Sequence, residues 1–197
     1  MKEGTWERGV LKESVELFDG WYVKREGNEV LKEVHNEVKA EDLRVEIHNW
    51  NEWEGVNKRV AELVIPPNCC NEAEWSVFDV SGLKWLKRIE IGDECFEYVD
   101  EVKLIDLSKL ERVVIGKNCF TSEWGDNPEY NPKRRFYLKN CKRLRELYIG
   151  CYSFSYYSAC EIENMPSLEM IWMGNDEECH SFYHASLKLK SDCERQK

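Results

Sequence analysis

Apolar and polar residues follow a repeating pattern over the middle and C-terminal parts of the chain. Four segments begin with a leucine, continue with alternating apolar positions and reach a glycine: LKRIEIGDECF, LERVVIGKNCF, LRELYIGCYSF and LEMIWMGNDEE. Their leading leucines, which are 24, 34 and 24 residues apart, are Leu86, Leu110, Leu144 and Leu168. Because the last apolar position and the glycine keep the same spacing, each stretch from one leading leucine to the next is a repeat.

A second apolar pattern precedes each leading leucine. Its residues recur at the same intervals and are Phe78, Val80 and Leu83; Val102, Leu104 and Leu107; Phe136, Leu138 and Cys141; and Cys160, Ile162 and Met165. Alternation with a period of two residues is typical of strands. We therefore expect two short strands in each repeat. The longest interval carries extra residues within 121–134, a segment with Gly125, Pro128 and Pro132 that predicts a surface loop.

A repeat of this kind cannot bury its apolar face alone, whereas stacked repeats share one continuous core. The pattern therefore predicts a β-rich repeat solenoid, in which a right-handed coil places parallel strands along two faces. We expect about five coils over residues 43–190, starting with the degenerate copy VAELVIPPNCC at Val60. An ordinary α/β domain is the alternative.

The first 42 residues do not share this period. The segment WYVKREGNEVLKEV, from Trp21, predicts a β-hairpin that turns at residues 26–28. We interpret residues 1–42 as an N-terminal capping segment and residues 191–197 as a tail. The stretch EGTWERGVL, from Glu3, is similar to the end of a MORN repeat. The chain is then either part of a longer protein or uses its two ends as caps, and the sequence leaves both readings open.

The repeats resemble leucine-rich repeats. LERVVIGKNCF matches the pattern LxxLxLxxNxL, with its signature positions at Leu110, Val113, Ile115, Asn118 and Phe120. The upstream copy matches through Asn68 and Cys70, whereas Glu94, Tyr152 and Asp176 replace the asparagine elsewhere. The resemblance implies a ladder of asparagine hydrogen bonds, which these replacements would interrupt. The ending IGxxCF looks like BspA-like leucine-rich repeats of protists and bacteria. The resemblance implies a fold and says little about function.

Composition narrows the classes of partner. The chain has 28 Lys and Arg against 38 Asp and Glu, a net charge of −10, which disfavours nucleic-acid binding. No apolar run approaches the length of a signal peptide or a membrane span, so we expect a cytoplasmic protein without membrane contact. No phosphate-binding glycine loop is present, because the glycines of the repeats stand singly. They predict turns that need either positive φ or close contact between coils.

The nine cysteines allow two interpretations. Cys69, Cys95 and Cys119 share one column of the repeat and Cys141 occupies a leucine column, which indicates small buried hydrophobic residues with reduced thiols. An alternative is a secreted or cell-surface adhesin-type leucine-rich repeat protein with some disulfides. Thiol titration would separate these two readings, because only the second predicts many oxidised cysteines.

Cysteine and histidine also suggest a metal or catalytic site. The best candidates for zinc ligands are Cys179, His180, His184 and Cys193. This segment lacks a CxxC pair and does not have the pattern of a helix, so a zinc site is disfavoured. The sequence around the cysteines matches no nucleophile motif. We therefore expect neither a metal, nor a cofactor, nor catalysis, and keep a Cys/His enzyme as the least favoured alternative.

The strand that follows each leading leucine offers a better functional signal. The residue between its last two apolar positions is expected to point outward on the concave face, and this column contains Val114, Tyr148 and Trp172. With Met170 these residues predict an apolar patch, and exposed aromatic patches mark partner sites. Arg112, Glu146 and Lys117 are expected to surround it. Alternatively, the patch packs under residues 121–134 or against another domain. The sequence thus predicts a non-catalytic protein–protein interaction module with Trp172 as its anchor.

Overall fold

The chain forms two compact units, Met1–Asp42 and Leu43–Lys197. The computed structural model describes residues 2–7, 10–18, 21–26, 29–35, 43–121, 133–174 and 179–190. Most of the predicted loop at 121–134 and the whole predicted tail at 191–197 lie outside these residues. Each unit is described below by itself.

The first unit is an antiparallel four-stranded sheet. Its strands lie in chain order and are β1 (Lys2–Glu7), β2 (Val10–Phe18), β3 (Trp21–Glu26) and β4 (Glu29–His35). The predicted hairpin corresponds to β3 and β4, which pair up to Glu26 and Glu29 at the expected turn. The sequence analysis predicted only this hairpin. The two preceding strands, β1 and β2, were not predicted.

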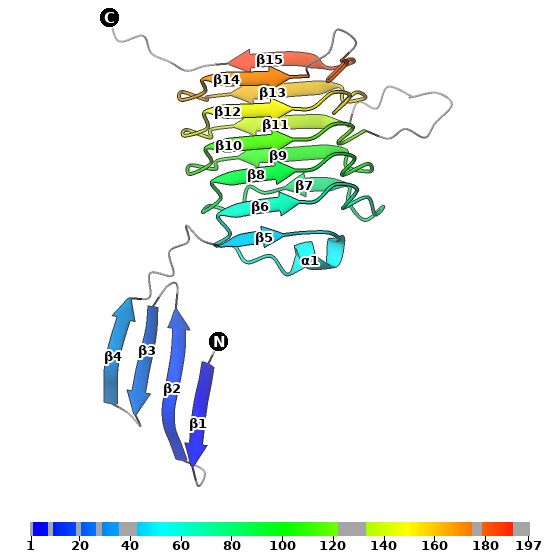
Figure 1. The fold of residues 1–197 in the computed structure, drawn as a ribbon. Helices are drawn as coiled ribbons and strands as arrows, with labels where there is room; N and C mark the ends of the chain where they lie inside the picture. Colours follow the sequence, from blue (N-terminus) through cyan, green and yellow to red (C-terminus); the bar gives the residue numbers. More distant parts are fainter. Residues whose placement is uncertain are drawn as a thin grey trace, which may run out of the picture. The chain divides into compact units, whose positions relative to one another are not determined.

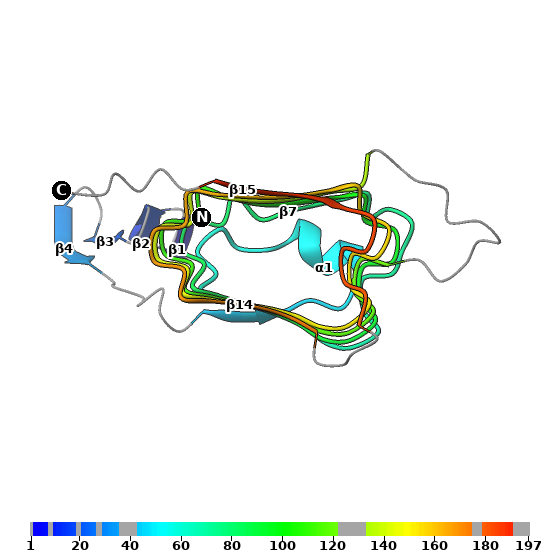
Figure 2. The ribbon, with the colours of Figure 1, turned by 90° about the horizontal axis from the view of Figure 1, so that it is seen from above.

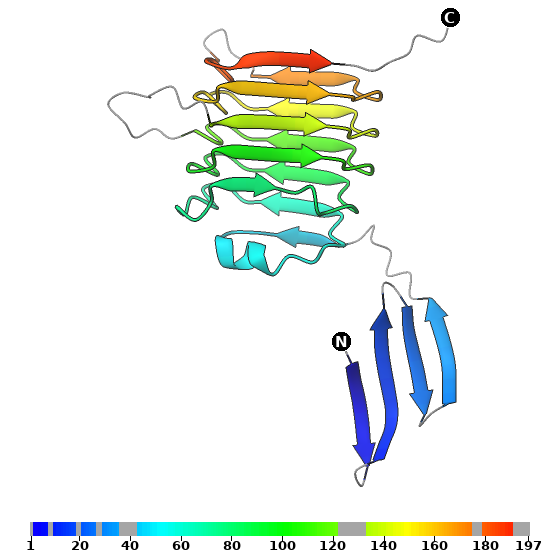
Figure 3. The ribbon, with the colours of Figure 1, turned by 180° about the vertical axis from the view of Figure 1, so that it is seen from behind.

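The second unit contains two sheets whose strands are all parallel. The six-stranded sheet has the order β14 (Met170–Met173), β12 (Glu146–Ile149), β10 (Arg112–Ile115), β8 (Arg88–Ile91), β6 (Glu62–Ile65) and β5 (Arg44–Glu46). The five-stranded sheet has the order β15 (Ser186–Lys190), β13 (Ala159–Glu163), β11 (Arg135–Lys139), β9 (Glu101–Ile105) and β7 (Val77–Asp79). From β6 onward the chain passes alternately from one sheet to the other (Figures 1 and 3).

The helix content is small. Among the described residues the one α-helix is α1 (Trp50–Glu54), which lies between β5 and β6 in the chain. Mostly parallel strands in two sheets with little helix confirm the predicted β-rich class and disfavour the α/β alternative. Seen end on, the two sheets form two facing layers (Figure 2).

The core lies between the two layers and follows the alternation in the sequence. In β12, for example, Leu147 and Ile149 are fully buried while Glu146 and Tyr148 are partly exposed. In β11 the same alternation buries Phe136 and Leu138. Full burial of one such side chain contributes about 1.5–3 kcal/mol, so the repeated columns supply most of the driving force for folding.

Stacked phenylalanines line the turns that follow the six-stranded sheet. The ring centroids of Phe96 and Phe120 are 5.0 Å apart, those of Phe120 and Phe154 4.6 Å, and those of Phe154 and Phe182 4.7 Å. All four residues have positive φ, between 53° and 62°. This backbone conformation is costly for a bulky residue. Burial and offset stacking of the rings compensate for that cost in every repeat.

The glycines of these turns are explained by close approach of backbones. A Cβ atom on Gly92 would lie 2.5 Å from the Pro67 nitrogen, and one on Gly116 would lie 2.6 Å from the carbonyl carbon of Gly92. Each turn therefore rests directly on the preceding one, and a side chain would separate them. Gly174 differs, because its φ of +72° is also a conformation that glycine adopts without strain.

The shared cysteine column acts as a ladder of hydrogen-bond donors. Four of its residues donate to a carbonyl group of the preceding turn; these bonds are Cys95 Sγ to Pro66 O (3.1 Å), Cys119 Sγ to Gly92 O (2.9 Å), Ser153 Oγ to Gly116 O (2.7 Å) and Ser181 Oγ to Gly150 O (2.8 Å). Cys69, the first member of the column, donates to Pro67 O of its own turn at 3.5 Å. The prediction that these cysteines are merely small hydrophobic residues was therefore incomplete. Serine replaces cysteine in this column because both can donate.

A second ladder occupies the turns after the five-stranded sheet. Asn140 Nδ2 donates to Asp106 Oδ1 at 2.8 Å, and Asn164 Nδ2 donates to Asn140 Oδ1 at 2.9 Å. All three residues have positive φ, which Asn and Asp tolerate better than most residues. The asparagine ladder implied by the resemblance was expected at Asn68 and Asn118. Those residues also have positive φ, but the observed side-chain ladder lies at the opposite turns.

Candidate interaction surface

The predicted partner-binding residues come from three neighbouring strands, β10, β12 and β14. Strand pairing places Val114 beside Tyr148 and Tyr148 beside Trp172, which makes one continuous row across the sheet. Arg112, Glu146 and Met170 form a second row parallel to it. The rows follow from the parallel, in-register pairing, because residues in one sequence column then lie side by side.

The two rows lie on the outer face of the six-stranded sheet. Their flanking neighbours Leu147 and Ile149 are fully buried against the other sheet, so Glu146 and Tyr148 must point the opposite way. Met170 is 46% exposed and Trp172 is 37% exposed. We call Val114, Tyr148, Met170 and Trp172 the aromatic patch.

Ring and charge contacts orient the centre of this face. The centroids of the Tyr148 and Trp172 rings are 6.2 Å apart at 50°. The Arg112 guanidinium carbon lies 5.2 Å from the centroid of the Tyr148 ring, and Arg112 Nε lies 3.3 Å from Glu146 Oε2. Both charged side chains are well exposed, so this ion pair contributes at most about 1 kcal/mol. It fixes the direction of the side chains more than it stabilises the fold.

Lys117 does not lie in the two rows. It belongs to the turn after β10, is exposed, and donates its backbone N–H to Asp93 Oδ1 at 2.8 Å. Arg88 and Glu90 on β8 continue the rows beyond β10, so charges also border the aromatic patch on that side. The alternative in which residues 121–134 cover the patch falls largely outside the described residues.

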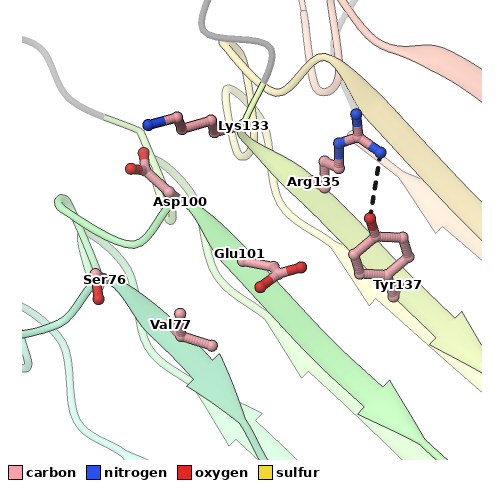
Figure 4. A pocket seen from close by; sticks show the side chains of 7 residues that line it. All are labelled: Ser76, Val77, Asp100, Glu101, Lys133, Arg135 and Tyr137. Carbon is pink, nitrogen blue, oxygen red and sulfur yellow. Dashed lines mark hydrogen bonds between the residues drawn. The ribbon is translucent and has the colours of Figure 1, made fainter.

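A pocket that the sequence did not predict lies on the five-stranded sheet (Figure 4). It has a volume of about 480 Å³ and is lined by Ser76, Val77, Asp100, Glu101, Lys133, Arg135 and Tyr137. Arg135 Nη1 donates to the Tyr137 hydroxyl at 3.5 Å, which raises the pKa of the guanidinium. The outward-facing pocket residues on β9 and β11 alternate along each strand with buried core residues. This alternation in the sequence is the signal that could have placed them on one outer face.

The lining of this pocket does not form a catalytic arrangement. Asp100 Oδ1 accepts a hydrogen bond from Arg134 Nε at 3.0 Å, within an ion pair that is mostly covered on the arginine side. The carboxylates of Asp100 and Glu101 come from the β9 side of the pocket, and the cations of Lys133 and Arg135 come from the β11 side (Figure 4). We therefore regard the pocket as a shallow polar recess that is secondary to the aromatic patch.

The candidate zinc ligands within the described residues, Cys179, His180 and His184, do not gather into a metal site. The His180 ring packs against Tyr183 with centroids 5.0 Å apart, and the His184 ring stacks on Tyr156 at 6.1 Å. Cys193 lies outside the described residues. Within the described part of the chain, no three His, Cys, Asp or Glu residues gather as metal ligands.

Most thiols of the second unit are poor nucleophiles. Burial raises the pKa of Cys141 to about 11 and that of Cys160 to about 12, and it also raises the pKa of Cys70. The thiolate is the reactive form, so these groups are inert at neutral pH. The cysteines of the described residues carry no disulfide.

Comparison of the chain with known proteins identified no relative. No protein-family model, curated protein or solved structure matches the chain. Among the described residues, no helix has the length and apolar character needed to cross a membrane.

Proposed function

We propose that this chain is a non-catalytic protein–protein interaction module built as a leucine-rich-repeat-like solenoid. The 24-residue period, the parallel strands in two sheets and the stacked turns support the solenoid. Its repeats would form a right-handed coil of about five turns, and a partner would bind on the outer face of β10, β12 and β14. The net charge of −10 supports a protein partner rather than a nucleic acid.

One observation carries this proposal: the exposed Trp172 and the partly exposed Tyr148 lie side by side on a regular sheet, next to Val114 and Met170. Aromatic side chains lose little rotamer entropy on binding and bury a large area. Trp and Tyr are therefore enriched among the residues that dominate binding energy. A rigid sheet holds them in place before the partner arrives, which lowers the entropy cost of association.

The charges around the aromatic patch would select the partner. Arg112 and Glu146 form an exposed pair, and Lys117 adds an exposed cation in the turn after β10. Exposed charges at the rim of an interface influence specificity and association rate more than affinity. A partner would therefore present an apolar centre with charges of both signs around it.

The proposal places the protein in the cytoplasm. The cysteines of the described residues carry no disulfide, although several lie in neighbouring repeats. Thiols remain reduced in the cytosol and are usually oxidised in secreted proteins.

Replacement of Trp172 by alanine tests the proposed site. A photoreactive phenylalanine analogue in place of Tyr148 captures the partner from cells that produce the protein, and calorimetry then measures the affinity of the purified pair. We expect Trp172→Ala to weaken binding by about thirtyfold or more, which corresponds to about 2 kcal/mol. Because the side chain is exposed, the free energy of unfolding should change by only about 0.5 kcal/mol.

Trp85 provides the matched control. It is 42% exposed, lies between β7 and β8 in the chain, and contacts Lys109 rather than the aromatic patch. Trp85→Ala should leave the affinity within about twofold of the wild type, since contacts outside the central cluster are nearly neutral. Unchanged binding by Trp172→Ala, in a protein that melts normally, would remove this face as the site.

A further inference from the structure

Cys151 and Cys179 occupy equivalent positions in two neighbouring turns. Cys151 follows Gly150 after β12, and Cys179 belongs to the turn that leads to β15. Three contacts fix the alignment of the two turns: the Phe154 and Phe182 rings stack at 4.7 Å, Phe182 N donates to Ser153 O at 3.3 Å, and Ser181 Oγ donates to Gly150 O at 2.8 Å.

The two sulfur atoms meet beside Gly174. A Cβ atom on Gly174 would collide with Cys179 Sγ, lie 2.8 Å from Cys179 Cβ and lie 3.4 Å from Cys151 Sγ. The two thiols are also hydrogen-bonded to each other. Neighbouring parallel backbones are about 4.8 Å apart, which lies within the range of about 4.4–6.8 Å between Cα atoms that disulfides span.

We propose that Cys151 and Cys179 form a reversible disulfide, so that oxidation joins the turns after β12 and before β15 by a covalent bond. This site does not depend on the proposed partner-binding function. In the reduced protein both sulfur atoms lie beside Gly174, and the bond forms when the two side chains rotate toward each other.

Exposure distinguishes this pair from another one in the chain. Cys95 and Cys119 also lie in neighbouring turns, but both residues are fully buried and both sulfurs donate to carbonyl groups of the preceding turn. Cys179 is partly exposed, so an oxidant reaches it first, and Cys151 lies behind it. The pair Cys95 and Cys119 thus serves as an internal reference that should stay reduced.

The reaction needs a two-electron oxidant such as hydrogen peroxide. The Cys179 thiolate attacks one peroxide oxygen, the O–O bond breaks, and a sulfenic acid and one water form. The Cys151 thiolate then attacks the Cys179 sulfur, the S–O bond breaks, and a second water leaves after protonation. Two thiols and one peroxide thus give one disulfide and two waters. A dithiol reductant reverses the reaction by thiol–disulfide exchange.

The local environment makes this reaction slow at neutral pH. Burial and the Cys151 thiol raise the pKa of Cys179, so the thiolate is scarce and its fraction grows as the pH rises. The pair would therefore resist mild oxidants and respond to sustained oxidation, as expected of a thiol pair in a reducing compartment.

Oxidation would stabilise the last described strands. Gly174 directly follows β14, and Cys179 lies seven positions before β15 begins at Ser186. Among the described strands, β14 pairs only with β12 and β15 only with β13, so they should open readily. A covalent bond between the two turns restricts that opening.

Peptide mapping tests the bond. The full chain is treated with hydrogen peroxide at about pH 8.5, where more thiolate is present, and is cleaved after glutamate without reduction. Cleavage after Glu161 and Glu178 separates the peptide that contains Cys151 from the one that contains Cys179. We expect a linked peptide pair that disappears on reduction.

Variants assign the two sulfurs. Cys151→Ser, Cys151→Ala and Cys179→Ser should each abolish the linked pair, while Cys160→Ser and Cys193→Ser, which alter the other cysteine of each peptide, should keep it. Circular dichroism checks that each variant is folded. If one of the two Cys151 variants does not fold, the other still tests the bond. A link that persists without Cys151, a link through Cys193, or no link at all overturns the proposal.

Hydrogen exchange tests the consequence. In the oxidised wild type, exchange in β14 and β15 should slow by about tenfold or more relative to the reduced protein, because chain closure limits local opening. Exchange in β8 and β9 should not change. Equal exchange in both redox states of a protein with the mapped bond would contradict the stabilising role.

Discussion

The two ends of Leu43–Lys197 are finished in different ways. At the end where β5 lies, the short helix α1 packs its tryptophans against the core: the Trp50 and Trp75 centroids are 4.9 Å apart, and those of Trp53 and Phe78 are 5.6 Å apart. Figure 2 shows α1 within the outline of the two layers. Asn49 caps the helix by accepting from the Glu52 N–H at 3.1 Å. Trp75 is completely buried as a result.

At the other end, the same apolar columns are open to solvent. Ile171 pairs with the fully buried Leu147, yet it is 38% exposed. Leu189 pairs with Ile162, which is 4% exposed, and is itself 59% exposed. In each pair the two residues belong to the same sequence column. They differ in the strand that lies on their other side.

This comparison shows that burial in a repeat protein is decided by the next repeat and not by the residue alone. An apolar side chain of the right type still gains little when one of its two neighbours is missing. We therefore expect the β5 end to be held by tertiary contacts of α1 and the β14–β15 end to be the less stable part of the unit.

The largest expected effect is at the closed end. Trp75→Ala removes a buried ring that contacts Trp50, Trp53 and Phe96, and it leaves a cavity beneath α1. Such a change costs about 3–5 kcal/mol. We expect the melting temperature to fall by about 10 °C, measured by circular dichroism. A fall no larger than that of the exposed control Trp85→Ala would mean that α1 does not close this end.

A smaller loss of stability is expected for substitutions at Leu147 and Ile171, and it should differ between these two residues of one column. Leu147→Ala should cost about 2–5 kcal/mol, because it creates a cavity between two neighbouring repeats. Ile171→Ala removes a similar side chain from the adjacent strand, but its partial exposure should limit the cost to about 1 kcal/mol. Chemical denaturation of both variants measures the difference. Equal losses would show that Ile171 is covered in solution, and the contrast between the two ends would then be wrong.

The arrangement of the strands could be predicted because the columns are numerous and regular. A parallel, in-register sheet places residues of one sequence column side by side, so the spacing of the leading leucines was enough to place Val114, Tyr148 and Trp172 in one row. The alternation of buried and exposed residues fixed which face they share. Whether this face binds a partner is a separate question, which strand geometry does not answer.

Features that depend on contacts between repeats could not be predicted in the same way. α1 has five residues, too few for a helical period to be visible. The donor role of Cys95 and Cys119 depends on carbonyl groups of the preceding repeat, and the only hint was their exchange with Ser153 in the same column. The contact between Cys151 and Cys179 was hidden because residues 175–178 interrupt the regular spacing.

Charge pairs on the open end provide the smallest expected effect. Lys188 on β15 lies 2.6 Å from Glu163 Oε1 and 3.3 Å from Glu161 Oε2, both on β13. Lys139 lies 2.6 Å from the same Glu161 oxygen. The pKa of Glu161 is lowered mainly by Lys139, and that of Glu163 is lowered mainly by Lys188. The two Lys188 pairs attach β15 to β13, in addition to the backbone ladder, whereas the Lys139 pair joins β11 to β13.

The attachment of β15 should therefore weaken in acid. The unfolded carboxyl groups titrate near 4.5 and the folded ones lower, so the ion pairs contribute fully above pH 4.5 and are lost as the pH falls through the folded pKa values. Hydrogen-exchange protection of β15, corrected for intrinsic rates and compared with β9, should fall a few-fold over this range. Lys188→Met should remove most of this dependence, whereas Lys190→Met on the same strand should retain it. A dependence that survives Lys188→Met would show that these pairs do not hold β15, and would leave the backbone ladder to β13 as its attachment.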